Sequence, residues 1–160
     1  NLNRKETVLA LKKHLNTMIE EFSFLNSLEA TARERLYHFI INASIIVSDT
    51  GQRIRNSGFA YHATKYLAWA ITNMESNVVL SGVKFIRERM KIYFELASCY
   101  EDIKSFKSAF KVVSQAMLKL SNLRNVEEQQ QTLPTHINIA LIESMRLMKS
   151  LELKYGVLVS

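Results

Sequence analysis

The stretch "YFELASCYEDIKSFKSAFKVVSQAML", residues 93–118, joins two apolar runs through a short polar turn. Its spacing is that of a tetratricopeptide unit, a helix pair of about 34 residues in which large residues on the first helix pack against small ones on the second. The residues that occupy this frame are Tyr93, Leu96, Ala97 and Tyr100 on the first helix, Phe106 in the turn, and Ala109, Val113 and Ala116 on the second helix. The stretch therefore predicts an antiparallel helical hairpin.

An earlier part of the chain fits the same frame. Its matching residues are Val47, Gly51, Ile54, Gly58, Ala63, Leu67 and Ala70. The two frames lie 46 residues apart, so "MESNVVLSGVKF", residues 74–85, is interpreted as an insertion. We predict repeat-like units at about residues 44–76 and 90–123.

Apolar residues recur at three- and four-residue intervals along almost the whole chain, which is typical of amphipathic helices. We predict six helices, at about residues 5–25, 27–56, 59–74, 80–100, 105–123 and 135–155. Ser27 is expected to cap the second helix and Gly156 to stop the sixth. The polar segment "RNVEEQQQTLP", residues 124–134, is predicted to be a loop, with Pro134 at or just before the start of the sixth helix. The predicted fold is all-α, with antiparallel helical hairpins stacked as a tetratricopeptide-like α-solenoid.

Composition agrees with helices held together by packing alone. Hydrophobic residues make up 48% of the 160 residues, and 4 glycines and 1 proline are too few for the many turns of a β-sandwich. A single cysteine forms no internal disulfide. The longest apolar run, "FIINASIIV" at residues 39–47, is about half of what spans a bilayer, so no membrane contact is expected. The first residue is Asn1 and the last residues, "YGVLVS", carry no cap, so we expect a single helical-repeat segment, residues 1–160, of a longer chain.

No pattern of residues predicts an active site. Cys99, the sole cysteine, has no histidine within one helical turn and has acidic neighbours, which do not favour a thiolate, so we interpret it as a packing residue. The histidines His14, His38, His62 and His136 fall on four different predicted helices without metal-ligand spacing, and the glycines never cluster into a phosphate-binding loop. Glu101 and Asp102 are explained by solvation. We expect no enzyme, no catalytic residue, no metal, no cofactor and no small-molecule substrate.

Basic residues form the one charged pattern that suggests a site. The formal charge is +6, and residues 57–124 carry 10 basic and 5 acidic residues. Two basic stripes at helical spacing are predicted on paired helices: Lys84, Arg87 and Lys91, then Lys104, Lys107 and Lys111. They are candidates for binding an acidic peptide, a tubulin tail or a nucleic-acid backbone, although a solvated face explains them as well. The absence of a known binding module and the buried aromatics argue against nucleic acid.

Two stretches resemble a known family. They are "ATKYLAWAITNMES", residues 63–76, and "VKFIRERMKIYFELASCYEDIKSFKSAFKVVSQAML", residues 83–118. The sequence is similar to the amino-terminal helical region of the cilia- and flagella-associated protein 54 family over about residues 28–125. The residues that carry the resemblance are Ala63, Tyr66, Leu67, Trp69, Ala70, Met74, Glu75, Ser76, Tyr93, Cys99, Tyr100, Ala109 and Ala116. The segment "IRER", residues 86–89, departs from the family, in which an aromatic residue precedes the arginine.

The resemblance implies a non-enzymatic structural scaffold of the central apparatus of the ciliary or flagellar axoneme, which holds partner subunits for ciliary motility. It implies other central-apparatus scaffold proteins as partners, with microtubules or acidic tails as further candidates. The alternative from the residues alone is a soluble tetratricopeptide-like adaptor that binds acidic peptides through its basic face.

Overall fold

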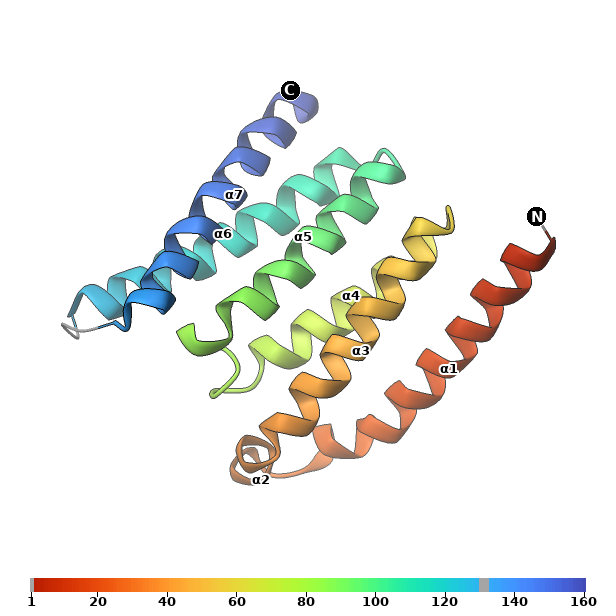
Figure 1. Cartoon of the computed structure of the whole chain (residues 1–160), viewed down its shortest axis with the longest axis horizontal. Coiled ribbons are helices and arrows are strands. Elements are labelled where there is room, and N and C mark those ends of the chain that lie inside the picture. Colours follow the sequence, from red (N-terminus) through yellow and green to blue (C-terminus); the bar gives the residue numbers. More distant parts are fainter. Residues whose placement is uncertain (1, 130–132) are drawn as a thin grey trace. The chain divides into compact units, whose positions relative to one another are not determined.

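The computed structural model describes residues 2–129 and 133–160, and regular secondary structure in these ranges is entirely helical. The chain divides into two compact units, Asn1–Leu80 and Ser81–Ser160. The first unit contains α1 (Leu2–Ser27), α2 (Ala30–Arg35), α3 (Tyr37–Asn56) and α4 (Ala60–Glu75), and the second contains the 3-10 helix η1 (Val83–Phe85), α5 (Ile86–Asp102), α6 (Phe106–Gln129) and α7 (Thr135–Val159). Within each unit, consecutive long helices run antiparallel (Figure 1). The predicted all-α class is confirmed.

In the first unit, α3 and α4 form the central hairpin, and α1 packs against α3. A glycine-terminated turn ends α3: Gly58 has φ 87°, the Gly58 amide donates to the Arg55 carbonyl, and the Phe59 amide donates to the Ile54 carbonyl. This pair of hydrogen bonds is the Schellman motif, in which a left-handed residue satisfies the last carbonyls of a helix. The predicted helix break at residues 56–58 is confirmed.

Polar contacts join α1 to α4. The Tyr66 hydroxyl donates to Asn16 Oδ1 at 3.0 Å, and Lys12 Nζ lies 3.2 Å from His62 Nδ1. Burial raises the pKa of the Tyr66 hydroxyl, because removal from water disfavours the phenolate. Val8 and Leu15 add buried apolar contact from the same helix.

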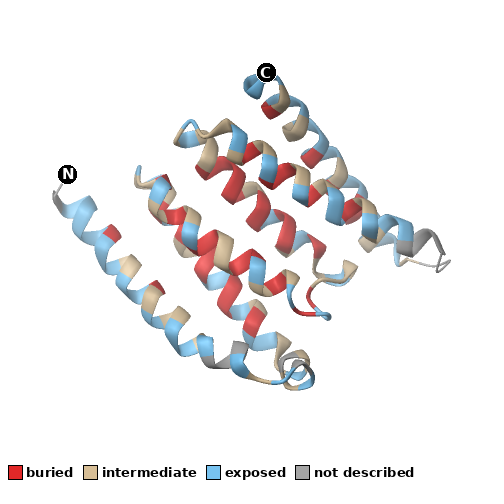
Figure 2. Ribbon diagram, turned by 180° about the vertical axis from the view of Figure 1, so that it is seen from behind, coloured by how far each residue is buried: buried red, intermediate tan, exposed pale blue. Residues whose placement is uncertain are grey.

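In the second unit, α5 packs against both α6 and α7, and α6 packs against α7. Arg89 is fully buried, and its guanidinium donates to the Gly82 carbonyl at 2.6 Å, which ties α5 to the segment that precedes it. Figure 2 shows buried residues concentrated along α3 and α4 in one unit and along α5 and α6 in the other.

The repeat frame predicts most of the buried positions, although Gly58 is exposed and Tyr100 and Phe106 are only half-buried. In the first unit Val47, Gly51, Ile54, Ala63, Leu67 and Ala70 are buried, and in the second Tyr93, Leu96, Ala97, Ala109, Val113 and Ala116 are buried. Gly51 marks a close contact, because a Cβ atom added there would lie 3.2 Å from the Leu67 side chain. Both predicted hairpins therefore exist, with one in each unit.

Three predicted boundaries are wrong at the start or middle of helices. Ser27 ends α1 instead of capping a second helix, and that second helix is divided at Leu36, whose φ of −95° and ψ of 17° leave the helical range. The helix expected from residue 80 begins at Ile86. Asn77 explains this delay, because its Oδ1 accepts hydrogen bonds from the Val79 and Leu80 amides and so favours a turn over a helix.

Two predicted ends are also wrong. α6 continues to Gln129, so the part of the predicted loop at residues 124–129 is helical, as suits its Arg, Glu and Gln residues. Residues 130–132 of that loop lie outside the described residues, while Pro134 immediately precedes α7, as predicted. α7 does not stop at Gly156 but continues to Val159.

Replacing Gly156 with alanine should raise the free energy of unfolding by about 0.5–1 kcal/mol, because glycine is a poor residue inside a helix. The new Cβ would meet Phe110 Cε2 at 3.5 Å, an ordinary van der Waals distance. Gly51→Ala is the matched control, and we expect no gain there because Leu67 occupies the space. Urea unfolding followed by circular dichroism measures both. Equal gains would mean that Gly51 does not mark a close helix contact.

Candidate partner-binding surface

The six predicted basic residues are all exposed. Lys84 lies in η1, Arg87 and Lys91 in α5, Lys104 in the turn after α5, and Lys107 and Lys111 in α6. Only two residues of each predicted stripe therefore lie on an α-helix.

The two groups of basic residues lie toward opposite ends of the α5–α6 hairpin. Arg87 is near the start of α5, whereas Lys107 is near the start of α6, which is joined to the end of α5. Because a helix rises 1.5 Å per residue, the 15 residues from Arg87 to Asp102 separate these ends by about 22 Å. The two groups of basic residues are therefore exposed on the two helices of one hairpin but are separated along its length.

The group at the start of α5 has charged and aromatic neighbours. Arg87 Nη2 lies 3.8 Å from Glu143 Oε2 of α7, and Lys84 Nζ lies 5.5 Å from the centre of the Phe85 ring. Both residues of the ion pair are largely exposed, so the pair adds little to stability. It nevertheless reduces the positive charge that this end offers to an acidic partner.

Lys104 stands out at the other end because of its backbone. Among residues 2–129 and 133–160 it is the one non-glycine residue with a positive φ, 61°. The Lys104 amide donates to the Glu101 carbonyl and the Ser105 amide to the Tyr100 carbonyl, so this turn is a second Schellman motif. A lysine occupies the place where glycine is usual, at a backbone cost of about 1 kcal/mol.

Replacing Lys104 with glycine should raise the free energy of unfolding by about 0.5–1 kcal/mol, because it relieves the left-handed conformation. Lys107→Gly is the control. It removes the same charge from a helical position and should lower stability by a similar amount. Chemical unfolding measures the change in the free energy of unfolding of each variant, and we expect the two changes to have opposite signs. A loss of stability for Lys104→Gly would show that its side chain stabilises the fold.

A polar cluster joins α7 to the end of α5. Lys154 Nζ donates to Glu101 Oε1 at 2.6 Å, and the Tyr155 hydroxyl donates to Glu101 Oε2 at 2.6 Å. The hydrogen bond from Lys154, and then that from Tyr155, lower the pKa of the Glu101 carboxyl, and the charges of Lys154 and Lys104 lower it further. The expectation that Glu101 is simply solvated is therefore wrong.

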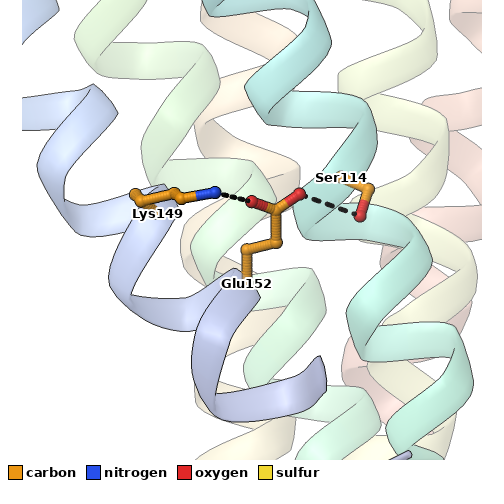
Figure 3. Close-up of polar contacts among 3 residues, drawn as sticks. All are labelled: Ser114, Lys149 and Glu152. Atoms are coloured by element: carbon orange, nitrogen blue, oxygen red, sulfur yellow. Dashed lines mark hydrogen bonds and ion pairs between the residues drawn. The ribbon is translucent and has the colours of Figure 1, made fainter. Parts of the chain in front are cut away.

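A second polar contact joins α7 to α6 (Figure 3). Ser114 Oγ of α6 donates to Glu152 Oε1 at 3.5 Å, and Lys149 Nζ donates to Glu152 Oε2 at 2.9 Å. Together with the Glu101 cluster, this contact links α7 to both helices of the α5–α6 hairpin.

The remaining candidate residues do not form a reactive site. Cys99 is fully buried, in agreement with its interpretation as a packing residue. Within the described ranges, no three His, Cys, Asp or Glu side chains lie close enough together to hold a metal ion. None of the helices in those ranges has an apolar stretch that would span a membrane.

Comparison with known protein families identifies the family of this chain. A model of the family described as cilia- and flagella-associated protein 54 matches residues 2–158. The chain belongs to this family. The match extends well beyond the residues 28–125 that carry the resemblance, and it includes both units. No curated protein and no solved structure matched the chain.

Membership of the cilia- and flagella-associated protein 54 family confirms the predicted association with cilia and flagella and supports localisation to the axoneme. The departure at residues 86–89 lies within the first turn of α5, inside the matched range. Sequence reasoning missed the contacts of Glu101 with Lys154 and Tyr155, because 53 and 54 residues separate the partners and no local spacing reveals them.

Proposed function

We propose that this chain is a non-enzymatic structural scaffold of the central apparatus of the ciliary or flagellar axoneme, in which tetratricopeptide-like hairpins hold partner subunits for ciliary motility. The observation that carries the proposal is the burial of the same repeat frame in both units of a chain from a cilia- and flagella-associated family. Tyr93, Ala109 and Ala116 in one unit have counterparts in Val47, Ala63 and Ala70 in the other.

Helical repeats suit this role for a physical reason. Each hairpin packs mainly on its neighbours, so a row of hairpins makes an extended surface whose features keep a fixed spacing. The partners that we propose are other central-apparatus scaffold proteins, with microtubules or acidic tails as further candidates.

Proximity labelling in ciliated cells tests the proposal. The chain is fused to a biotin ligase, and a ligase targeted to the cilium without the chain serves as the control. We expect axonemal proteins, central-apparatus subunits above all, to be enriched by the fusion over the control. Equal labelling by the two proteins would overturn the scaffold role.

An adaptor for acidic peptides is the second candidate, and Lys104 favours it. A lysine kept in a left-handed conformation at the cost of about 1 kcal/mol suggests that its side chain is needed for something other than folding. Lys107 and Lys111 are exposed on the first two turns of the helix that follows.

Binding of a synthetic poly-glutamate peptide at low salt tests the adaptor. We expect Lys104→Gly and Lys107→Gln each to weaken binding, whereas Lys13→Gln, at an exposed position of α1, should leave it unchanged. If all three variants bind alike, the peptide senses only the net charge of the chain and the adaptor reading is wrong.

A further inference from the structure

α7 is apolar on two opposite sides. One side packs in the second unit through the buried residues Ala140, Leu141, Ser144, Met148 and Tyr155. The other side exposes Ile139, Ile142, Arg146, Lys149, Leu153 and Val157, which we call the outer seam. At 100° per residue the outer seam occupies an arc of only about 80°, centred opposite the buried side.

The spacing of the outer seam is that of a coiled-coil contact. Its positions follow one another at three- and four-residue intervals from Ile139 to Val157, as the core positions of a heptad repeat do. Leu153 is 62% exposed and Val157 is 75% exposed. A helix that already buries one apolar side has no intramolecular need for a second, so this row of side chains is suited to receiving another helix.

The middle of the outer seam is basic. Ile139 and Ile142 lie at one end and Leu153 and Val157 at the other, with Arg146 and Lys149 between them. The positive charge of Lys149 is compensated by Glu152, whose Oε2 atom lies 2.9 Å from Lys149 Nζ. For Arg146 we find no carboxylate within ion-pair distance in the described parts of the chain.

This charge argues against pairing with a second copy of α7. In an antiparallel pair, Ile139 would face Val157 and Ile142 would face Leu153, which is favourable. The same alignment would place Arg146 opposite Lys149 twice, and a parallel pair would place Arg146 opposite itself. Like charges that face each other across an interface disfavour that pairing.

We propose that the outer seam binds an amphipathic partner helix whose own seam is apolar at both ends and acidic in the middle. The partner's apolar residues pack on the two apolar ends, and its carboxylates face Arg146 and Lys149. The outer seam thereby defines one class of partner for the scaffold proposed above, and this inference rests on that proposed function.

Two designed helical peptides test the seam against the chain of residues 1–160. Both carry the same apolar seam ends, and they differ only in having glutamate or lysine at the two central seam positions. Fluorescence anisotropy should show the glutamate peptide binding at least about tenfold more tightly than the lysine peptide. Arg146→Glu should weaken binding of the glutamate peptide and strengthen binding of the lysine peptide.

Leu153→Glu should weaken binding of the glutamate peptide at least about tenfold, since it places a charge in the apolar contact. Leu118→Glu is a closely matched control, because Leu118 is 61% exposed but lies on α6, outside the seam, and we expect no effect there. Sedimentation should show a monomer without peptide.

Three results would overturn the proposal: equal affinity for the two peptides, no exchange of preference in Arg146→Glu, or a dimer that Leu153→Glu dissociates. None of these three results would contradict the scaffold role, because proximity labelling by the intact chain does not depend on this seam. Absence of axonemal labelling, in turn, would overturn the scaffold role without changing the affinity for the peptides. The failure of one proposal can therefore be distinguished from the failure of the other.

Discussion

Ala116→Leu should lower the free energy of unfolding of the second unit by about 1–3 kcal/mol, because the added methylene and methyl groups have no space. Ala116 is fully buried on the side of α6 that also carries Ala109, Val113 and Leu120. Alanines at 109 and 116 allow close approach of helix backbones, as the repeat frame requires. A leucine there must push the helices apart or adopt a strained rotamer.

Gln115→Leu is the control, since it places the same leucine side chain at the neighbouring exposed position and should change stability little. Urea unfolding gives the two free energies, and hydrogen exchange locates the loss to α5 and α6. If Ala116→Leu proved as stable as Gln115→Leu, α6 would not pack closely at this point and the repeat interpretation of the second unit would fail.

The sequence predicts the helices and the buried sides well because both depend on local spacing. Apolar residues at three- and four-residue intervals specify a helix and its inner side at once. The frame that begins at Tyr93 therefore also predicts that Ala109 and Ala116 are buried, as they are in the structure.

Helix ends were harder to predict because they depend on competition between backbone and side-chain hydrogen bonds. The Asn77 side chain accepts two backbone amides and delays α5, and the dihedral angles at Leu36 interrupt a helix where no glycine or proline stands. Gly156 was expected to end α7, yet the helix continues through it. Glycine permits a stop without requiring one.

For the candidate surface, the sequence predicts which basic residues are involved but not how they are grouped on the structure. The six basic residues are exposed, but their grouping depends on where α5 begins and on the turn that contains Lys104. The outer seam of α7 has a signal in the sequence, the spacing of Ile139, Ile142 and Leu153. That spacing alone does not say which of two apolar sides is buried, and packing on α5 and α6 decides it.

Tyr155→Phe should lower the free energy of unfolding by about 1.5 kcal/mol at neutral pH, because a hydrogen bond to a charged carboxylate is lost. Tyr155 is almost fully buried, and its hydroxyl lies 2.6 Å from Glu101 Oε2. The loss lies at the low end of the usual range for such bonds because Glu101 is partly exposed, so water can replace the lost donor. Tyr61→Phe, at an exposed tyrosine in the first unit, should have no effect.

The loss should depend on pH with a definite sign. The pKa of Glu101 is lowered in the folded chain, first by the hydrogen bond from Lys154 and then by that from Tyr155. A lowered folded pKa contributes stability that is fully present above the unfolded glutamate pKa of about 4.3 and is lost as the pH falls through the folded value. The difference between Tyr155→Phe and the parent chain should therefore shrink as the pH is lowered from about 6 to about 3. Urea titrations across this range measure it. A difference that stayed constant would mean that Tyr155 stabilises α7 by packing and not through the Glu101 carboxylate.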